Sequence, residues 1–146
     1  MIDEEQVKAL VGTVFPGGTI TIEAWEHRLM CDTLLVEPPA DGTAHPFYAY
    51  QATRAGMGLD LDEMFALCLA DPDDGGMFGE HEAELDRPLR VGETYAVRGS
   101  ITDVERKQGR TAGTFDMITF RLELLDDRGR RVATARNKWI FPRRES

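Results

Sequence analysis

The most regular alternation of apolar and polar residues in this chain runs from Thr114 to Leu125, and it constrains the fold most strongly. A period of two is typical of a strand that buries one face in an antiparallel sheet. We expect neighbouring strands at Tyr95–Val104 and Val132–Phe141, joined to it by a loop at Glu105–Gly113 and a turn at Asp126–Gly129. The predicted inward side chains are Ile118, Phe120, Leu122 and Leu124, and the outward ones are Thr119, Arg121 and Glu123. The second half of the chain therefore predicts an antiparallel meander.

The only largely apolar helix candidate precedes this meander, within Ala44–Gly58. Pro46 suits a first helical turn, and nothing from Phe47 to Ala55 breaks a helix. Gly56 and Gly58 supply its C-terminal stop. Shorter predicted elements are a helix at Asp3–Val11, a strand at Thr19–Ile22, an ambiguous segment at Glu23–Val36, a helix beginning at Asp60 and a strand at His81–Leu85. One strand, an apolar helix and a run of antiparallel strands is an α+β order, which a long curved sheet wrapped around one helix satisfies most simply.

Composition narrows the classes of function. The length of 146 residues predicts one domain over residues 1–146, and the formal net charge of −9 argues against a nucleic-acid or anionic membrane surface. No apolar run approaches a membrane span, and the acidic N-terminus is unlike a signal peptide, so we expect a cytoplasmic protein. Cys31 and Cys68 are expected to be buried free thiols, and the spacing of His and Cys predicts no metal site.

Two segments resemble a known family. Arg87–Tyr95, which reads RPLRVGETY, is similar to the start of the second long strand in MaoC-like hydratases and dehydratases, and Ala44-His45-Pro46 stands where that family has Ala-His-Gly. The resemblance covers roughly residues 12–142. It implies the hotdog fold, an α+β architecture in which a curved antiparallel sheet wraps one central helix. It also implies addition or removal of water at the 2,3-position of an enoyl or 3-hydroxyacyl thioester. Coenzyme A or an acyl carrier enters as part of the substrate, and no other cofactor is expected.

The family's chemistry rests on an Asp-x4-His pair after the first strand, which holds the reacting water. Asp32 falls on the Asp of this motif, but Glu37 stands where the His should be, so the strict motif is absent. Two neighbouring carboxylates can shift one another's pKa and so act as acid and base. The alternative is that both are ordinary surface charges.

A backbone N–H at the start of the central helix polarises the thioester carbonyl in this family. Pro46 has no N–H, so the N–H of Phe47 would have to serve. His45 lies at the same helix end, where the helix dipole favours a neutral base, although a capping or packing role is the alternative. These considerations make Asp32, Glu37 and His45 the candidate catalytic residues, and Phe47, Tyr48 and Gly56 the candidate substrate-binding residues.

Other polar residues have plainer interpretations. His27 and His81 are expected on strand surfaces, and Tyr48 and Tyr50 either line a substrate tunnel or pack in the core or in an interface. Five basic side chains are either solvated loop charges or contacts to the phosphates of coenzyme A: Arg106, Lys107, Arg110, Arg143 and Arg144.

Three functions follow as hypotheses. The first is a hydro-lyase of the enoyl-CoA hydratase or 3-hydroxyacyl dehydratase type. The second is a non-catalytic subunit that pairs with a catalytic MaoC-like partner, and the third is an acyl-CoA thioesterase. The expected partners are an acyl-CoA thioester and a second hotdog subunit, in a homodimer or a heterodimer, without nucleic acid or membrane.

Overall fold

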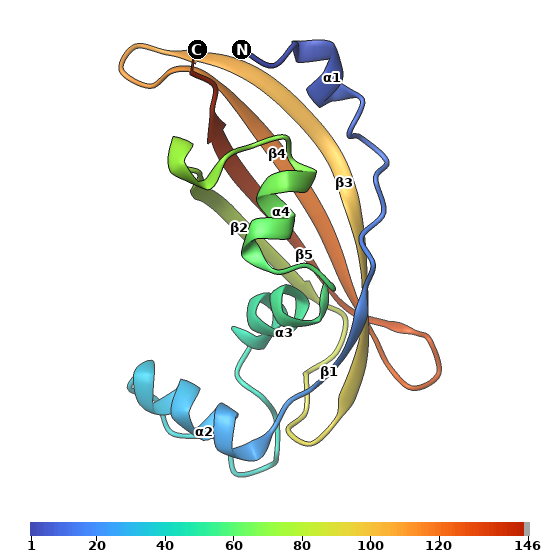
Figure 1. Ribbon diagram of the computed structural model, residues 1–146. Helices are drawn as coiled ribbons and strands as arrows, with labels where there is room; N and C mark the ends of the chain where they lie inside the picture. Colours follow the sequence, from blue (N-terminus) through green and yellow to red (C-terminus); the bar gives the residue numbers. More distant parts are fainter. Residues whose placement is uncertain (145–146) are drawn as a thin grey trace.

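The strands form one curved antiparallel sheet, as a computed structural model that describes residues 1–144 shows (Figure 1). Its strand order is β1-β3-β4-β5-β2. The strands are β1 (Gly18–Thr21), β2 (Met77–Leu85), β3 (Thr94–Gly109), β4 (Gly113–Leu125) and β5 (Arg131–Pro142). The consecutive pairs β3–β4 and β4–β5 confirm the predicted meander, and β2 lies beside β5 at one edge.

The concave face of the sheet carries the apolar core. All four side chains of β4 that were predicted to face inward are 0–1% exposed. Thr119 and Glu123 lie on the outer face of β4, as predicted, but each is only 8% exposed there. Glu123 accepts a hydrogen bond from Arg98 of the neighbouring strand, and the long arginine side chains beside it shield it from water.

The predicted loop at Glu105–Gly113 is wrong. Pairing between β3 and β4 continues to the pair Gly109–Gly113, so only three residues remain for the turn. A buried ion pair inside this hairpin explains the extension, since Arg106 donates two hydrogen bonds to Asp116, at 2.8 and 2.9 Å. Arg143 binds the same carboxylate at 2.7 Å and also donates to two carbonyls at the end of α4. Arg106 and Arg143 are therefore structural cations and not solvated loop charges.

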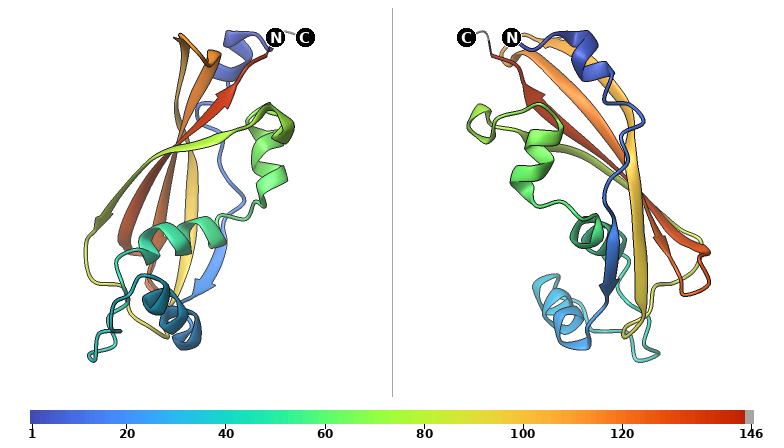
Figure 2. Two further views of the ribbon diagram at one scale, coloured as in Figure 1. Left: turned by 90° about the vertical axis from the view of Figure 1, so that its left-hand side faces the viewer. Right: turned by 45° about the vertical axis from the view of Figure 1, so that its right-hand side comes forward.

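The predicted central helix is confirmed as α3 (Tyr48–Gly56), which lies across the concave face and contacts all five strands (Figures 1 and 2). Ala49 and Ala52 are at most 1% exposed, so small side chains allow the helix to lie close to the sheet. The expected α+β hotdog architecture, a curved sheet around one helix, is thus confirmed.

Three further α-helices and one short 3-10 helix complete the described fold. The ambiguous segment after β1 forms the helix α2 (Ala24–Thr33), which lies at the end of the sheet beyond α3 (Figure 1). The helix α4 (Leu61–Leu67) begins, as predicted, at Asp60, whose side chain accepts the Glu63 N–H in a capping box. The others are α1 (Glu4–Lys8) and the short 3-10 helix η1 (Pro72–Asp74). Every helix within residues 1–144 is too short or too polar to cross a membrane.

Candidate functional site

The loop that leads into α3 is held by the Arg87–Tyr95 segment. The Ala44 N–H donates to the Leu89 carbonyl at 2.7 Å, and the Val91 N–H donates to the Gly42 carbonyl at 2.9 Å. Tyr95 is fully buried, and its hydroxyl accepts the Arg90 N–H at 3.0 Å. The segment that resembles the family motif thus fixes the position of the N-terminus of α3.

The backbone donors at that N-terminus are all used within the protein. The His45 N–H donates to Nε2 of His27 at 2.9 Å, and the Phe47 N–H donates to Nδ1 of His45 at 3.1 Å. The Tyr48 N–H donates to the His45 carbonyl at 3.0 Å, and Pro46 has no N–H. His45 therefore caps the helix, and the Phe47 N–H, which was the expected donor to a thioester carbonyl, is occupied by its ring.

His27 was expected on a strand surface, and this prediction is wrong. It lies on α2, is 3% exposed, and packs its ring 5.7 Å from that of Tyr48. Burial lowers the pKa of His27, and the charge of His45 lowers it further. Since Nε2 accepts the His45 N–H, the imidazole is neutral with its proton on Nδ1. A helix over Glu23–Val36 would have placed His27 and Cys31 on one face, at i and i+4, but not the contact with His45, which is 18 residues away in sequence.

We expect the stability of the protein to fall as the pH drops below about 6.5, the ordinary histidine pKa, because the unfolded chain then protonates His27 while the folded chain resists. The slope for one proton is at most about 1.4 kcal/mol per pH unit. Urea unfolding from pH 7 to 5 checks this, and His27→Gln should flatten the curve. His81→Gln is the control, and an equal flattening in both variants would contradict the prediction.

The two carboxylates that were candidates for acid and base both lie on the surface. Asp32 is exposed near the end of α2, and Glu37 is exposed in the loop that follows. Leu35 between them has a left-handed backbone, φ 57°. Within residues 1–144, no hydrogen bond or ion pair joins either carboxylate to the other or to His45.

The three candidate substrate-binding residues differ in accessibility. Phe47 is 37% exposed, and its ring lies 5.5 Å from that of Tyr50. Tyr48 is buried, and burial raises the pKa of its hydroxyl. Gly56 is buried against Val97, where an added Cβ would come within 2.4 Å of a methyl carbon. Phe47 is the most exposed of the three.

A cluster that the sequence did not reveal lies between α3 and β2. The Tyr50 ring is 5.2 Å from the ring of His81, and Nδ1 of His81 is 2.7 Å from Oδ1 of Asn137. Asn137 is 1% exposed, and its Nδ2 is a buried donor without a partner in the described residues. Phe78, 41% exposed, packs on Tyr50 from the same strand as His81. His81 is on a strand, as predicted, but on the side that faces α3. Its partner Asn137 is 56 residues away, so no local pattern pointed to it.

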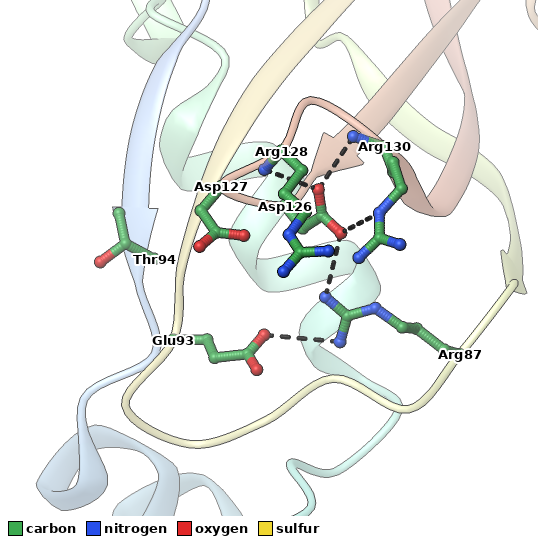
Figure 3. Close-up of a pocket in the computed structure, with 7 residues that line it drawn as sticks. All are labelled: Arg87, Glu93, Thr94, Asp126, Asp127, Arg128 and Arg130. Atoms are coloured by element: carbon green, nitrogen blue, oxygen red, sulfur yellow. Dashed lines mark hydrogen bonds and ion pairs between the residues drawn. The ribbon is translucent and has the colours of Figure 1, made fainter.

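The hollow at the turn between β4 and β5, about 480 Å³ in volume, is rich in charge (Figure 3). Asp126 lies at its centre and accepts the backbone N–H groups of Arg130 and Arg128, both at 2.9 Å, which hold the pKa of this carboxyl below its usual range. Arg87 bridges Asp126 and Glu93. These acids and arginines neutralise one another and fix the turn, so we assign the hollow no part in chemistry.

Both cysteines lie in the interior of the protein. Cys31 and Cys68 are both free and buried, as predicted. Burial raises the pKa of Cys68 to about 12, so it stays a thiol. No group of three or more His, Cys, Asp or Glu side chains in the described part of the chain is arranged to hold a metal ion.

A family of proteins matches most of this core. The sequence pattern of the FAS1-like dehydratase domain region matches residues 47–135, which run from the start of α3 into β5. No curated protein is similar in sequence to the chain.

Solved structures share the fold. The C-terminally truncated HadBC complex, a 3R-hydroxyacyl-ACP dehydratase from Mycobacterium tuberculosis, matches with a TM-score of 0.70 and 16% identity, covering 90% of this chain and 96% of that one. The ChsH1–ChsH2 complex from the same organism matches with a TM-score of 0.71 and 18% identity, over 97% and 90%. The R-hydratase PhaJ1 from Pseudomonas aeruginosa matches with a TM-score of 0.60 and 15% identity, over 92% and 83%. Because the sequence identities are this low, the similarity between this chain and these structures shows a shared fold and nothing more.

Proposed function

Since the chain belongs to the FAS1-like dehydratase-region family of MaoC-like hotdog proteins, we propose that it is a subunit of a hydratase or dehydratase of acyl thioesters. In this proposal the chain contributes one wall of the acyl pocket and an edge strand that pairs with a second subunit. A second hotdog subunit contributes the acid and the base.

The observation that carries the proposal is the N-terminus of α3. A hydratase needs a backbone donor there for the developing oxyanion, and an acid and base beside the substrate. Here the Phe47 N–H is donated to His45, and Pro46 has none to give. Asp32 and Glu37 are exposed carboxylates, without the histidine of the motif. The start of α3 in this chain thus offers neither a free Phe47 N–H nor the motif histidine.

The arrangement near β2 supports the role of a pocket wall. Phe47, Tyr50 and His81 form an aromatic surface beside the edge strand, so a second subunit that pairs with β2 would cover it. Two of the similar structures, HadBC and ChsH1–ChsH2, are complexes, which agrees with pairing between unlike chains. Coenzyme A or an acyl carrier would then arrive as part of the substrate, with no separate cofactor.

The test is the hydration of crotonyl-CoA and longer enoyl thioesters, followed by the loss of enoyl absorbance. We expect no turnover from the pure chain, and turnover when it is co-purified with a MaoC-like chain that has an intact Asp-x4-His motif. In that complex, Asp32→Asn, Glu37→Gln and His45→Gln in this chain should each leave kcat nearly unchanged. Replacing the motif histidine of the catalytic chain should lower kcat by about 10²–10⁴-fold.

Two results would contradict the subunit role. Turnover by the pure chain that Glu37→Gln or Asp32→Asn abolishes would assign catalysis to these carboxylates. Release of free thiol from saturated acyl-CoA would instead show a thioesterase.

A second candidate, a self-sufficient hydratase, is favoured by the His81–Asn137 pair. Asn137 fixes Nδ1 of His81, so Nε2 is the nitrogen that would exchange a proton with substrate. In that case the pure chain turns over enoyl thioesters, and His81→Gln lowers kcat by about 10²-fold or more.

A further inference from the structure

Within residues 1–144, the two end strands of the sheet each pair on one side only, but they differ in length, since β1 has four residues and β2 has nine. At the β1 edge, the segment before β1 continues the pairing along β3, since the Gly12 N–H donates to the Ile101 carbonyl and the Phe15 N–H to the Gly99 carbonyl. At the other edge, β2 pairs with β5 on one side only, and none of the residues 1–144 pairs with its outer side (Figures 1 and 2). An open edge of nine residues is a site for pairing with another chain.

Three glutamates occupy one face of this open strand. Glu80, Glu82 and Glu84 alternate with His81 and Ala83, and the His81 ring faces α3, so the glutamates lie on the convex face. The side chains of Glu80 and Glu82 are 67% and 73% exposed.

The nearest cations lie one strand further in. On β5, Lys138 is 3.5 Å from Glu80 and Arg136 is 3.8 Å from Glu82, while Glu84 is opposite Thr134. These exposed pairs neutralise the row only in part. A strand added at the open side would therefore meet the glutamates directly.

Pairing with a second copy of this chain opposes like charges. Residues directly opposite one another in an antiparallel pair share a face of the sheet. A pair of β2 strands centred on Glu82 opposes Glu82 to itself and Glu80 to Glu84. If the pair is centred on His81, Glu80 of each copy lies opposite Glu82 of the other. If it is centred on Ala83, Glu82 of each copy lies opposite Glu84 of the other. Each such contact is unfavourable, and the net charge of −9 on every copy adds to the repulsion.

We infer that the open edge of β2 selects an unlike partner: a second hotdog chain whose edge strand carries lysine or arginine side chains on its convex face, opposite Glu80, Glu82 and Glu84. The inference rests on the proposed subunit role and specifies the charge that the partner's edge strand carries. The glutamates prevent self-pairing, and the same charges attract a basic edge. On the concave side, Phe78 and Tyr50 offer apolar surface that such a partner would bury.

Sedimentation velocity of the isolated chain over a concentration series tests this. The triple variant with Glu80→Gln, Glu82→Gln and Glu84→Gln should form a dimer with a dissociation constant about tenfold below that of the wild type. Raising the salt concentration to about 1 M should shift the wild type in the same direction, because the Debye length falls to about 3 Å. The triple variant with lysine at the same three positions should form a one-to-one pair with the wild type.

The matched control is the triple variant Glu5→Gln, Asp62→Asn and Asp103→Asn, which changes the net charge equally on α1, α4 and β3 and should not dimerise. Circular dichroism checks that each variant is folded. A wild type that is already a stable dimer through β2, a glutamine variant that stays like the wild type or forms open-ended aggregates, or no mixed pair with the folded lysine variant would each overturn the inference. Self-association is measured without substrate, so these outcomes are separate from the activity test of the subunit role.

Discussion

Replacing Asp116 by alanine is expected to lower the free energy of unfolding by about 3–5 kcal/mol, because it leaves a buried arginine without its counter-charge. Asp116 is 0% exposed and accepts hydrogen bonds from Arg106 and from Arg143, whose side chain is 4% exposed. Arg143 also donates to the carbonyls of Cys68 and Leu69, so the carboxylate joins the hairpin, the end of β5 and the end of α4.

Urea unfolding at pH 7 measures the effect. Asp86→Ala is the control, since its ion pair with Arg131 is exposed and should be worth less than about 1 kcal/mol. A loss from Asp116→Ala no larger than that of the control would contradict a structural role for the network.

The Asp116 carboxylate also makes the stability of the protein depend on pH in acid. Burial by itself raises the pKa of Asp116, but the hydrogen bonds from Arg106 and Arg143 outweigh burial and hold that pKa below its usual range. This depressed pKa stabilises the folded protein at pH values above the pKa of Asp116 in the unfolded chain, which is about 4. The stabilisation is lost as the pH falls through the lower pKa of Asp116 in the folded protein. The difference in stability between the wild type and Asp116→Asn should therefore shrink in acid.

Gly56→Ala is expected to lower the free energy of unfolding by about 1–3 kcal/mol, the range typical of overpacking a core. The added Cβ would lie 2.4 Å from a methyl carbon of Val97 and 3.2 Å from its Cβ, where α3 crosses β3. Gly56 was a candidate substrate-binding residue, so this variant separates a packing role from a binding role.

A double-mutant cycle tests the cause. Val97→Ala removes the methyl groups that the new Cβ would meet, so the double variant Gly56→Ala, Val97→Ala should cost less than the sum of the two single variants. Additive losses would contradict a direct clash between these residues. If Gly56 instead binds substrate, Gly56→Ala raises KM in the assembled enzyme without a loss of stability.

The parts of the fold that local patterns encode were predicted well. The alternation in Thr114–Leu125 predicted β4 and its buried face, and the capping residue Asp60 marked the start of α4. The Arg87–Tyr95 segment predicted the start of β3, and its buried Tyr95 explains why that segment is constrained. The hairpin between β3 and β4 was predicted too short, because its charged residues looked like a loop until Arg106 was paired with Asp116.

By itself, the sequence determined the order of the central helix and the long strands, the α+β class and the family, since period, helix stops and a short motif are properties of neighbouring residues. Only the tertiary structure decided what the polar residues do. It used the Phe47 N–H for the His45 ring, buried His27 behind α3, brought Asn137 to His81 and enclosed Asp116 between two arginines. Apart from the bond between His45 and Phe47, which are two residues apart, these roles depend on burial or on contacts between residues distant in sequence, and both come from packing, which no local spacing records.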